Sequence, residues 1–182
     1  MSEEQIIKTH DISGQLVSEA IKRDYGICRD LYHGTSEYEA DKIRKTAEIK
    51  IGSEYGYLGR GIYCYLHDVE ASRIWARIKN KTGKIAVFKL VANLGNIFYI
   101  CQELHRIFYN KATKHKEIKL AVNEKVGYII ELFVKQIIIP DYDIDIHTVG
   151  RSYMLEKKRS VLMYSLHDKL MVKKIELFWE GQ

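Results

Sequence analysis

Residues 52–65 read GSEYGYLGRGIYCY and contain four glycines and four tyrosines. A regular helix or strand tolerates this density of glycine poorly, so we expect a loop that enters a strand at Gly61 or Ile62. Glycine lets a ligand approach the backbone closely, and tyrosine rings offer flat apolar faces with polar rims. Together with the nearby strand-like run 31–35, LYHGT, the loop predicts a nucleotide pocket. It is not of the phosphate-loop type, because the sequence has no GxxxxGK[ST] motif.

The pattern along the rest of the chain predicts an α+β fold, with strands early and late, helices between them and no regular βαβ alternation. Capping residues and apolar spacing predict helices over 6–22, 37–45 and 68–79, capped by Ser13, Ser36 and Asp68. A short helix is also expected over 153–158. Strands are expected over 31–35, over 84–100 with a break at 93–96, twice within 128–146, and over 173–179.

Composition and length indicate one globular domain over 1–182. The chain has 182 residues, of which 46% are hydrophobic and 29% charged, which excludes intrinsic disorder. No stretch approaches the roughly 18 apolar residues of a membrane span, and the first ten residues do not form a secretory signal. We therefore expect a cytoplasmic protein without a membrane partner. Cys28, Cys64 and Cys101 are expected to be reduced thiols, and no Cys/His spacing predicts a metal site.

The net charge of +5 is concentrated in two segments. Residues 111–125 contain five lysines and two glutamates, and residues 151–182 contain seven basic and four acidic residues. A basic patch attracts polyanions, so RNA or DNA is one candidate partner of these segments and a protein is another. A solvated lysine-rich surface explains the same charge without any partner.

Four sequence pieces together resemble a known family. The pieces, in chain order, are HGT at 33–35, GYLGRGIY at 56–63, ASRIWA at 71–76 and VANLGNI at 91–97. They are similar to the NAD-binding core of the poly(ADP-ribose) polymerase-like ADP-ribosyltransferases. The resemblance covers about residues 28–146, and it implies a split, mostly antiparallel pair of sheets around an NAD cleft with flanking helices. It divides the chain into an N-terminal helical arm (1–27), a catalytic core (28–146) and a basic C-terminal extension (147–182).

The resemblance also implies roles for the residues of the NAD cleft. His33 would bind a hydroxyl of the adenosine ribose, with Thr35 beside it in the cofactor site. The Gly34 backbone and the Ser72 hydroxyl would hold the nicotinamide carboxamide. Tyr63 would pack on the nicotinamide ring, and Trp75 lies near the place of a second stacking aromatic residue.

The third catalytic position, an acid that supports the positive charge developing on the ribose, has three candidates. Glu131 lies within an apolar run that we interpret as a buried strand, where an acid is costly unless it is paired or functional. The usual family spacing would place Tyr128 at this position instead, and Glu124 is the other nearby acid. We favour Glu131, with His33 and Tyr63 as its catalytic partners.

The function expected from this resemblance is transfer of a single ADP-ribose from NAD⁺ to RNA, DNA or protein, with release of nicotinamide. Such an enzyme would use NAD as its substrate and need no metal. It would resemble free-standing bacterial toxins or phage-defence effectors, whose partners include an antitoxin or regulatory protein. Two alternatives stay open: an inactive module that binds NAD, ADP-ribose or a protein, and an NAD glycohydrolase.

Overall fold

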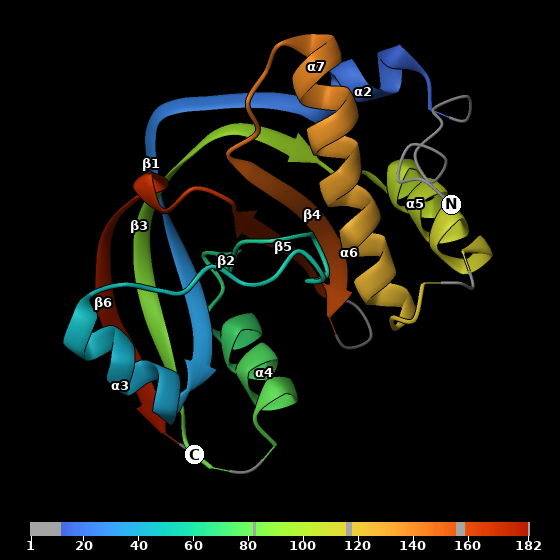
Figure 1. The fold of residues 1–182 in the computed structure, drawn as a ribbon. Coiled ribbons are helices and arrows are strands. Elements are labelled where there is room, and N and C mark those ends of the chain that lie inside the picture. Colours follow the sequence, from blue (N-terminus) through green and yellow to red (C-terminus); the bar gives the residue numbers. More distant parts are fainter. Residues whose placement is uncertain (1–11, 82, 116–117, 156–158, 182) are drawn as a thin grey trace.

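A strongly curved sheet of six strands forms the centre of the protein in a computed structural model, which describes residues 12–81, 83–115, 118–155 and 159–181 (Figure 1). The strand order is β1-β2-β5-β4-β3-β6, and β1 also pairs with β3, so the first five strands close into a ring. All pairings are antiparallel except that of β3 with β4. The strands are β1 (Ile21–Ser36), β2 (Ile62–Leu66), β3 (Ile85–Tyr99), β4 (Thr148–Leu155), β5 (Arg159–Leu166) and β6 (Val172–Gly181).

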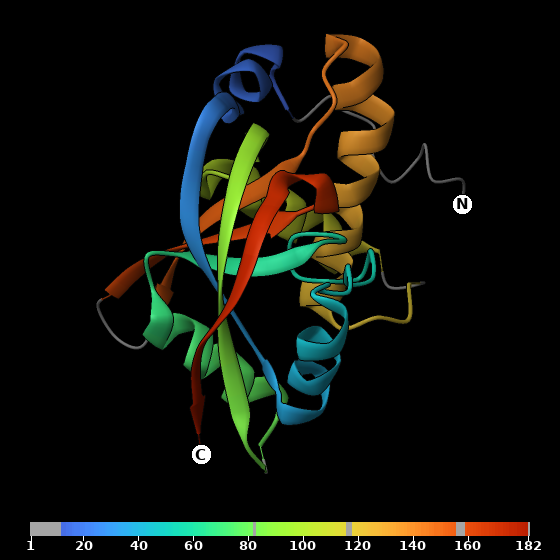
Figure 2. The ribbon, with the colours of Figure 1, turned by 90° about the vertical axis from the view of Figure 1, so that its left-hand side faces the viewer.

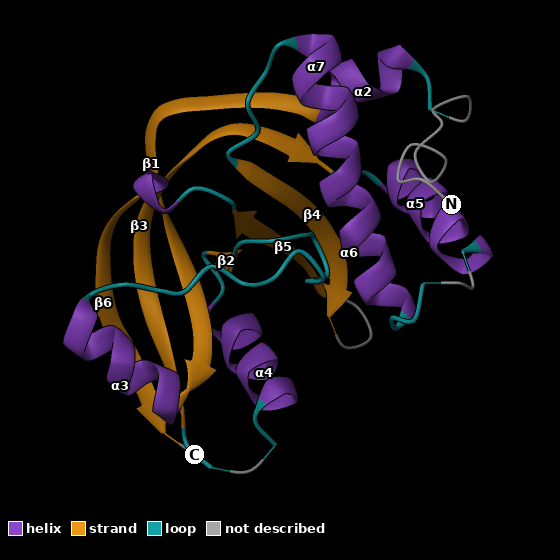
Figure 3. Ribbon diagram, in the orientation of Figure 1, coloured by secondary structure: helices purple, strands orange, loops and turns teal. Residues whose placement is uncertain are grey.

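The helices lie at both ends and along one side of the sheet. Both ribbon views place α2 at one end of the long strands, α3 and α4 at the other end, and α6 along the side (Figures 1 and 2). With strands and helices in one structure, the α+β class is confirmed (Figure 3). The helices are α2 (Gly14–Ala20), α3 (Glu37–Thr46), α4 (Val69–Lys79), α5 (Gln102–Lys114), α6 (Val122–Phe133) and α7 (Ile139–Tyr142), with a π-helical turn (Val134–Ile138) and a 3₁₀ turn (Lys169–Met171).

Three helix N-termini confirm the capping predictions. The hydroxyl of Ser13 accepts a hydrogen bond from the Leu16 amide at 3.2 Å, and that of Ser36 accepts one from Glu39 at 3.3 Å. The carboxylate of Asp68 accepts one from the Ala71 amide at 2.8 Å. Each cap satisfies a backbone donor that the first turn of a helix leaves unpaired. The starts of α3 and α4, which flank the site described below, could therefore be located from local sequence.

The prediction of strands within 128–146 is wrong. The segment continues α6 from Val122 to Phe133 and passes through the π-helical turn into α7. Val126, Ile129, Ile130 and Phe133 follow the i, i+3, i+4, i+7 spacing of one helix face, and all four are almost fully buried. Because these residues pack against β3 and α5 in the larger hydrophobic core, tertiary burial outweighs the strand preference of a β-branched run.

The last part of the chain also differs from expectation. Residues 153–155, predicted as the start of a helix, belong to β4, because β4 pairs with β5 in a continuous antiparallel register; residues 156–158 lie outside the described part. The strand predicted over 173–179 is confirmed as β6. β4 and β5 lie between β2 and β3 in the sheet. Residues 147–182, which we expected to extend a complete catalytic core, therefore supply central strands of the sheet.

Two differences concern the first half of the chain. The predicted helix over 6–22 is described only from residue 12, and in that part it covers Gly14–Ala20 before β1 begins at Ile21. The expected break at 93–96 is an irregularity within one continuous strand, β3. Gly95 there has φ +61°, and the facing strand β1 shifts register between Asp24 and Cys28. A left-handed glycine lets the strand bend sharply without ending.

Candidate functional site

A cleft of about 890 Å³ lies between residues 52–61, which we call the glycine-rich loop, α4, the start of α6 and strand β5. Five aromatic residues line it, which is the kind of wall that planar ligands select. Polar side chains, among them two lysines, line it together with a few aliphatic residues and glycines. We call this cavity the aromatic cleft; its aromatic residues are Tyr55, Tyr57, Tyr63, Trp75 and Tyr153, and its polar ones include His33, Lys50, Ser53, Lys79, Asn123 and Glu124.

Tyr63 on β2 and Trp75 on α4 face the cleft together. Their ring centroids are 6.1 Å apart and their planes differ by only 14°. Rings with nearly the same tilt can contact the same flat ligand. The ammonium group of Lys79 lies 5.3 Å from the centroid of Trp75, which places a positive charge next to this aromatic pair.

The hydroxyl of Tyr63 holds the glycine-rich loop in place. It donates a hydrogen bond to the Gly59 carbonyl oxygen at 2.8 Å and accepts one from the Leu58 amide at 2.6 Å. Burial raises the pKa of the Tyr63 phenol well above its usual value, so the group stays protonated. The hydroxyl is thus occupied by the protein, while the ring is available to a ligand.

His33, at the end of β1, is fixed by a single hydrogen bond. Its Nδ1 lies 2.8 Å from the Tyr63 carbonyl oxygen, which can only accept, so Nδ1 carries the proton. Burial lowers the pKa of His33, and the ring is neutral at pH 7. Its Nε2 therefore presents a lone pair.

A second cavity of about 630 Å³ adjoins the aromatic cleft, and His33, Lys50, Gly52 and Ser53 line both. We call it the lysine lobe. Two of its lysines are already paired within the protein: Lys42 with Glu39 at 2.9 Å and Lys169 with Glu48 at 3.2 Å. The lobe is lined by α3, the segment after it and Lys169, and Thr35 also faces it.

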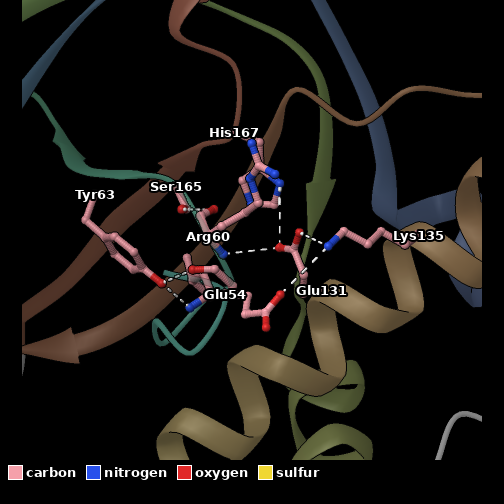
Figure 4. A network of polar contacts seen from close by, with 9 residues as sticks. Glu54, Arg60, Tyr63, Glu131, Lys135, Ser165 and His167 are labelled. Atoms are coloured by element: carbon pink, nitrogen blue, oxygen red, sulfur yellow. Dashed lines mark hydrogen bonds and ion pairs between the residues drawn. The ribbon is translucent and has the colours of Figure 1, made fainter. Parts of the chain in front are cut away.

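Glu131 does not line the aromatic cleft. It projects from α6 toward the back of the glycine-rich loop, and only 3% of its surface is exposed (Figure 4). Its Oε2 accepts a hydrogen bond from the Arg60 amide at 3.1 Å, and its Oε1 lies 3.2 Å from the Lys135 ammonium group. Oε2 is also 4.0 Å from Nδ1 of His167, whose pKa is lowered by burial. The carboxylate thus anchors the loop that Tyr63 holds from the other side.

The glycines of the loop let α6 approach it very closely. A Cβ on Gly127 of α6 would overlap the Gly56 carbonyl oxygen, and a Cβ on Gly59 would lie 2.6 Å from Oε2 of Glu131. Gly59 also has φ +79°, a conformation that favours glycine. Part of the glycine content that predicted a ligand site therefore serves the packing of backbone against backbone.

The structure brings some of the predicted residues together and separates others. His33, Tyr63 and Trp75 share the aromatic cleft, and Thr35 lies next to it in the lysine lobe. Ser72 is fully buried, and its hydroxyl donates to the Tyr32 and Asp68 carbonyl oxygens at 2.8 and 3.1 Å.

Gly34 packs against the backbone of Ser72, where a Cβ would overlap the Ser72 carbonyl oxygen. Of the other two acid-position candidates, Glu124 lines the cleft and accepts a hydrogen bond from the Ala121 amide at 3.0 Å. The ring of Tyr128 lies 5.6 Å from that of Tyr55.

Sequence reasoning missed a polar cluster beside the cleft. Arg151 on β4 donates a hydrogen bond to the Tyr57 hydroxyl, and its guanidinium carbon lies 5.3 Å from the Tyr57 ring centroid. The ring of His105 lies 6.4 Å from that of Tyr57, and burial together with the charge of Arg151 lowers the pKa of His105 to about 4. These residues are far apart in the sequence, and only the pairing of β4 with β5 and the packing of α5 bring them together.

Comparison with known proteins identifies the family. A family model described as "DNA polymerase family B viral insert" matches residues 62–180, from the start of β2 to the end of β6. The chain belongs to this family. Among curated proteins, none matches the sequence.

Membership in the DNA polymerase family B viral insert family contradicts the function that we predicted from the sequence motifs. The identification as an ADP-ribosyltransferase is wrong, and so are the transferase activity and the toxin or phage-defence role that were derived from it. The glycines allow the loop to pack against α6, and the tyrosines form an aromatic wall of the cleft. Unrelated proteins can share both features. In the described residues no group of three or more His, Cys, Asp or Glu side chains is arranged to hold a metal, and no helix is long and apolar enough to cross a membrane.

Proposed function

We propose that this protein is a non-catalytic module that binds single-stranded DNA, with bases stacked on the walls of the aromatic cleft. The observation that carries the proposal is the pair formed by Tyr63 and Trp75, two nearly parallel rings in one cavity with Lys79 beside them. Stacking on aromatic side chains next to positive charge is the usual way in which proteins bind single strands without reading sequence.

Two further features support DNA as the ligand. The family to which the chain belongs is named after an insert of a DNA polymerase, an enzyme that works on DNA strands. The chain also has a net charge of +5, which favours association with a polyanion. The narrower expectation of an ADP-ribosyltransferase fold stays a prediction, and DNA binding does not depend on it.

Binding is measured with a fluorescein-labelled oligo(dT) by anisotropy. Replacing Trp75 by Leu removes one stacking face, and we expect the Kd to rise about 5- to 150-fold, since each stacked base contributes roughly 1–3 kcal/mol. Trp75→Phe keeps an aromatic face and is expected to retain most of the affinity. Tyr109→Leu is the matched control, because Tyr109 is an exposed aromatic residue on α5 that does not line the cleft.

The chain offers an internal reporter for the same experiment. Its two tryptophans are Trp75 and Trp179, so in a Trp179→Phe background Trp75 is the only tryptophan. Oligo(dT) is expected to quench this fluorescence, and NAD⁺, the ligand predicted from the sequence, is added as a competitor. Absence of quenching with unchanged anisotropy would refute DNA binding, and equal binding by Trp75→Leu would refute its assignment to the cleft.

A further inference from the structure

The boundary between the aromatic cleft and the lysine lobe has the features of a phosphate site. His33, Lys50, Gly52 and Ser53 line both cavities, so a chain-like ligand that occupies both must pass these residues. One nucleotide unit in each cavity would place their linking phosphodiester at this boundary. Such a phosphate site rests on the proposed binding of single-stranded DNA and would determine how two successive nucleotides are held.

Lys50 is the cation available for this phosphate. In the lysine lobe, Lys42 and Lys169 each already have a glutamate as an ion-pair partner. Among the described residues, no side chain forms a hydrogen bond or ion pair with Lys50, which is exposed at the boundary. A lysine on a flexible stem at such a place can reach a phosphate as a point charge.

Two neutral groups complete the boundary. The hydroxyl of Ser53 has no hydrogen-bond partner within the described residues, so it can donate to a phosphate oxygen. His33 is neutral and presents only the lone pair of Nε2, so it adds no second positive charge. The phosphate would therefore be held mainly by one cation.

We propose that Lys50 and Ser53 bind the phosphodiester that joins two successive nucleotides of a DNA strand, the first with its base in the aromatic cleft and the second in the lysine lobe. Lys50 supplies the positive charge and Ser53 a hydrogen bond. The assignment predicts that the protein distinguishes a charged from an uncharged linkage between the same two bases.

The test compares two dinucleotides, TpT and its methylphosphonate analogue, whose linkage is neutral. The protein with its natural sequence is expected to bind TpT roughly 10-fold more tightly, because hydrogen bonds to a charged group are stronger than those to a neutral one. Lys50→Gln should remove most of this preference by weakening TpT binding alone. Ser53→Ala should reduce it partly.

Lys45→Gln is the matched control, because Lys45 is an exposed lysine on α3 that lines neither cavity. It should leave the preference unchanged. With oligo(dT), Lys50→Gln should also lower the salt dependence of log K by slightly less than one, the value for one lost phosphate contact on a single strand.

The outcomes separate the two proposals. If oligo(dT) binds through Trp75 but Lys50→Gln retains the preference for TpT and the original salt dependence, the phosphate assignment is overturned and the DNA-binding proposal stands. Equal weakening of both dinucleotides by Lys50→Gln would also overturn it, since this would indicate loss of structure or of base contacts. If neither TpT nor oligo(dT) binds and Trp75 fluorescence does not respond, both proposals fail.

Discussion

Gly127 of α6 and Gly56 of the glycine-rich loop lie so close that a Cβ on Gly127 would overlap the Gly56 carbonyl oxygen. The long buried helix and the loop that forms one wall of the aromatic cleft are therefore in direct backbone contact. Beside this contact, Glu131 accepts a hydrogen bond from the Arg60 amide. α6 thus positions the loop and with it one wall of the cleft, although most residues of α6 do not line the cleft.

Replacing Gly127 by Ala is expected to destabilise the protein by roughly 2–4 kcal/mol, because the added methyl group meets rigid backbone and α6 must shift. Urea unfolding followed by circular dichroism measures this change. Gly14→Ala is the control: Gly14 opens α2, and a Cβ there would make only an ordinary contact, at 3.4 Å from the Tyr142 hydroxyl. A change below 0.5 kcal/mol for Gly127→Ala would mean that the close approach is not required.

Glu131→Ala should cost roughly 1–3 kcal/mol, since it leaves the Arg60 amide without its acceptor and removes the nearer of the two acids beside the exposed Lys135. Glu131→Gln should cost less, because the amide oxygen can still accept from Arg60. Urea unfolding gives both values, and limited proteolysis shows whether cleavage within residues 52–61 increases. Glu103→Gln, an exposed acid in the first turn of α5, is the control. Equal stability of both Glu131 variants would contradict the anchoring role.

Tyr63→Phe distinguishes the contribution of the Tyr63 ring from that of its hydroxyl. Loss of the bonds to Leu58 and Gly59 is expected to reduce stability by about 1–2 kcal/mol. The ring that faces Trp75 remains, so the affinity for oligo(dT) should change less than threefold, well below the loss that stacking accounts for. Tyr63→Leu removes both features and should lose affinity as well. If Tyr63→Phe binds as poorly as Tyr63→Leu, the hydroxyl and not the ring is what the ligand needs.

Stability should fall as the pH is lowered from about 6.5 toward 4, with His105 as one cause. Burial and the charge of Arg151 lower the pKa of His105 to about 4, against 6.5 for an ordinary histidine. In this window the unfolded chain binds a proton that the folded protein excludes, so protonation favours unfolding. One proton contributes at most about 1.4 kcal/mol per pH unit, and solvent screening of the half-buried ring makes the contribution smaller.

His105→Gln tests this assignment by urea unfolding at several pH values. The variant should lose less stability between pH 6.5 and 4 than the protein with its natural sequence. His33 and His167 also have pKa values lowered by burial, so part of the dependence should persist in the variant. An identical pH dependence in both proteins would show that His105 takes up its proton as easily in the folded state as in the unfolded one.

Local sequence was sufficient for the features that depend on a few neighbouring residues. Ser13, Ser36 and Asp68 cap helices as predicted, because a cap needs only its own side chain and the amide two or three residues later. The glycine-rich loop and the start of the strand that follows it were also predictable, since glycine density is a local signal. His33, Tyr63 and Trp75 line one cavity, while the ligand role predicted for them stays a prediction.

The tertiary structure decided the rest, and residues 128–134 show why. This apolar run fits a buried strand or a buried helix equally well, and the contact of its apolar face with β3 and α5 selects the helix. The helical turn then directs Glu131 to the back of the loop, whereas a strand over the same residues predicts it in the ligand site. Local sequence did not indicate that Lys50, Arg151 or His105 lies at or beside the cleft, because their surroundings come from segments distant in sequence. A side chain's chemistry depends on what surrounds it, and here long-range packing alone supplies those surroundings.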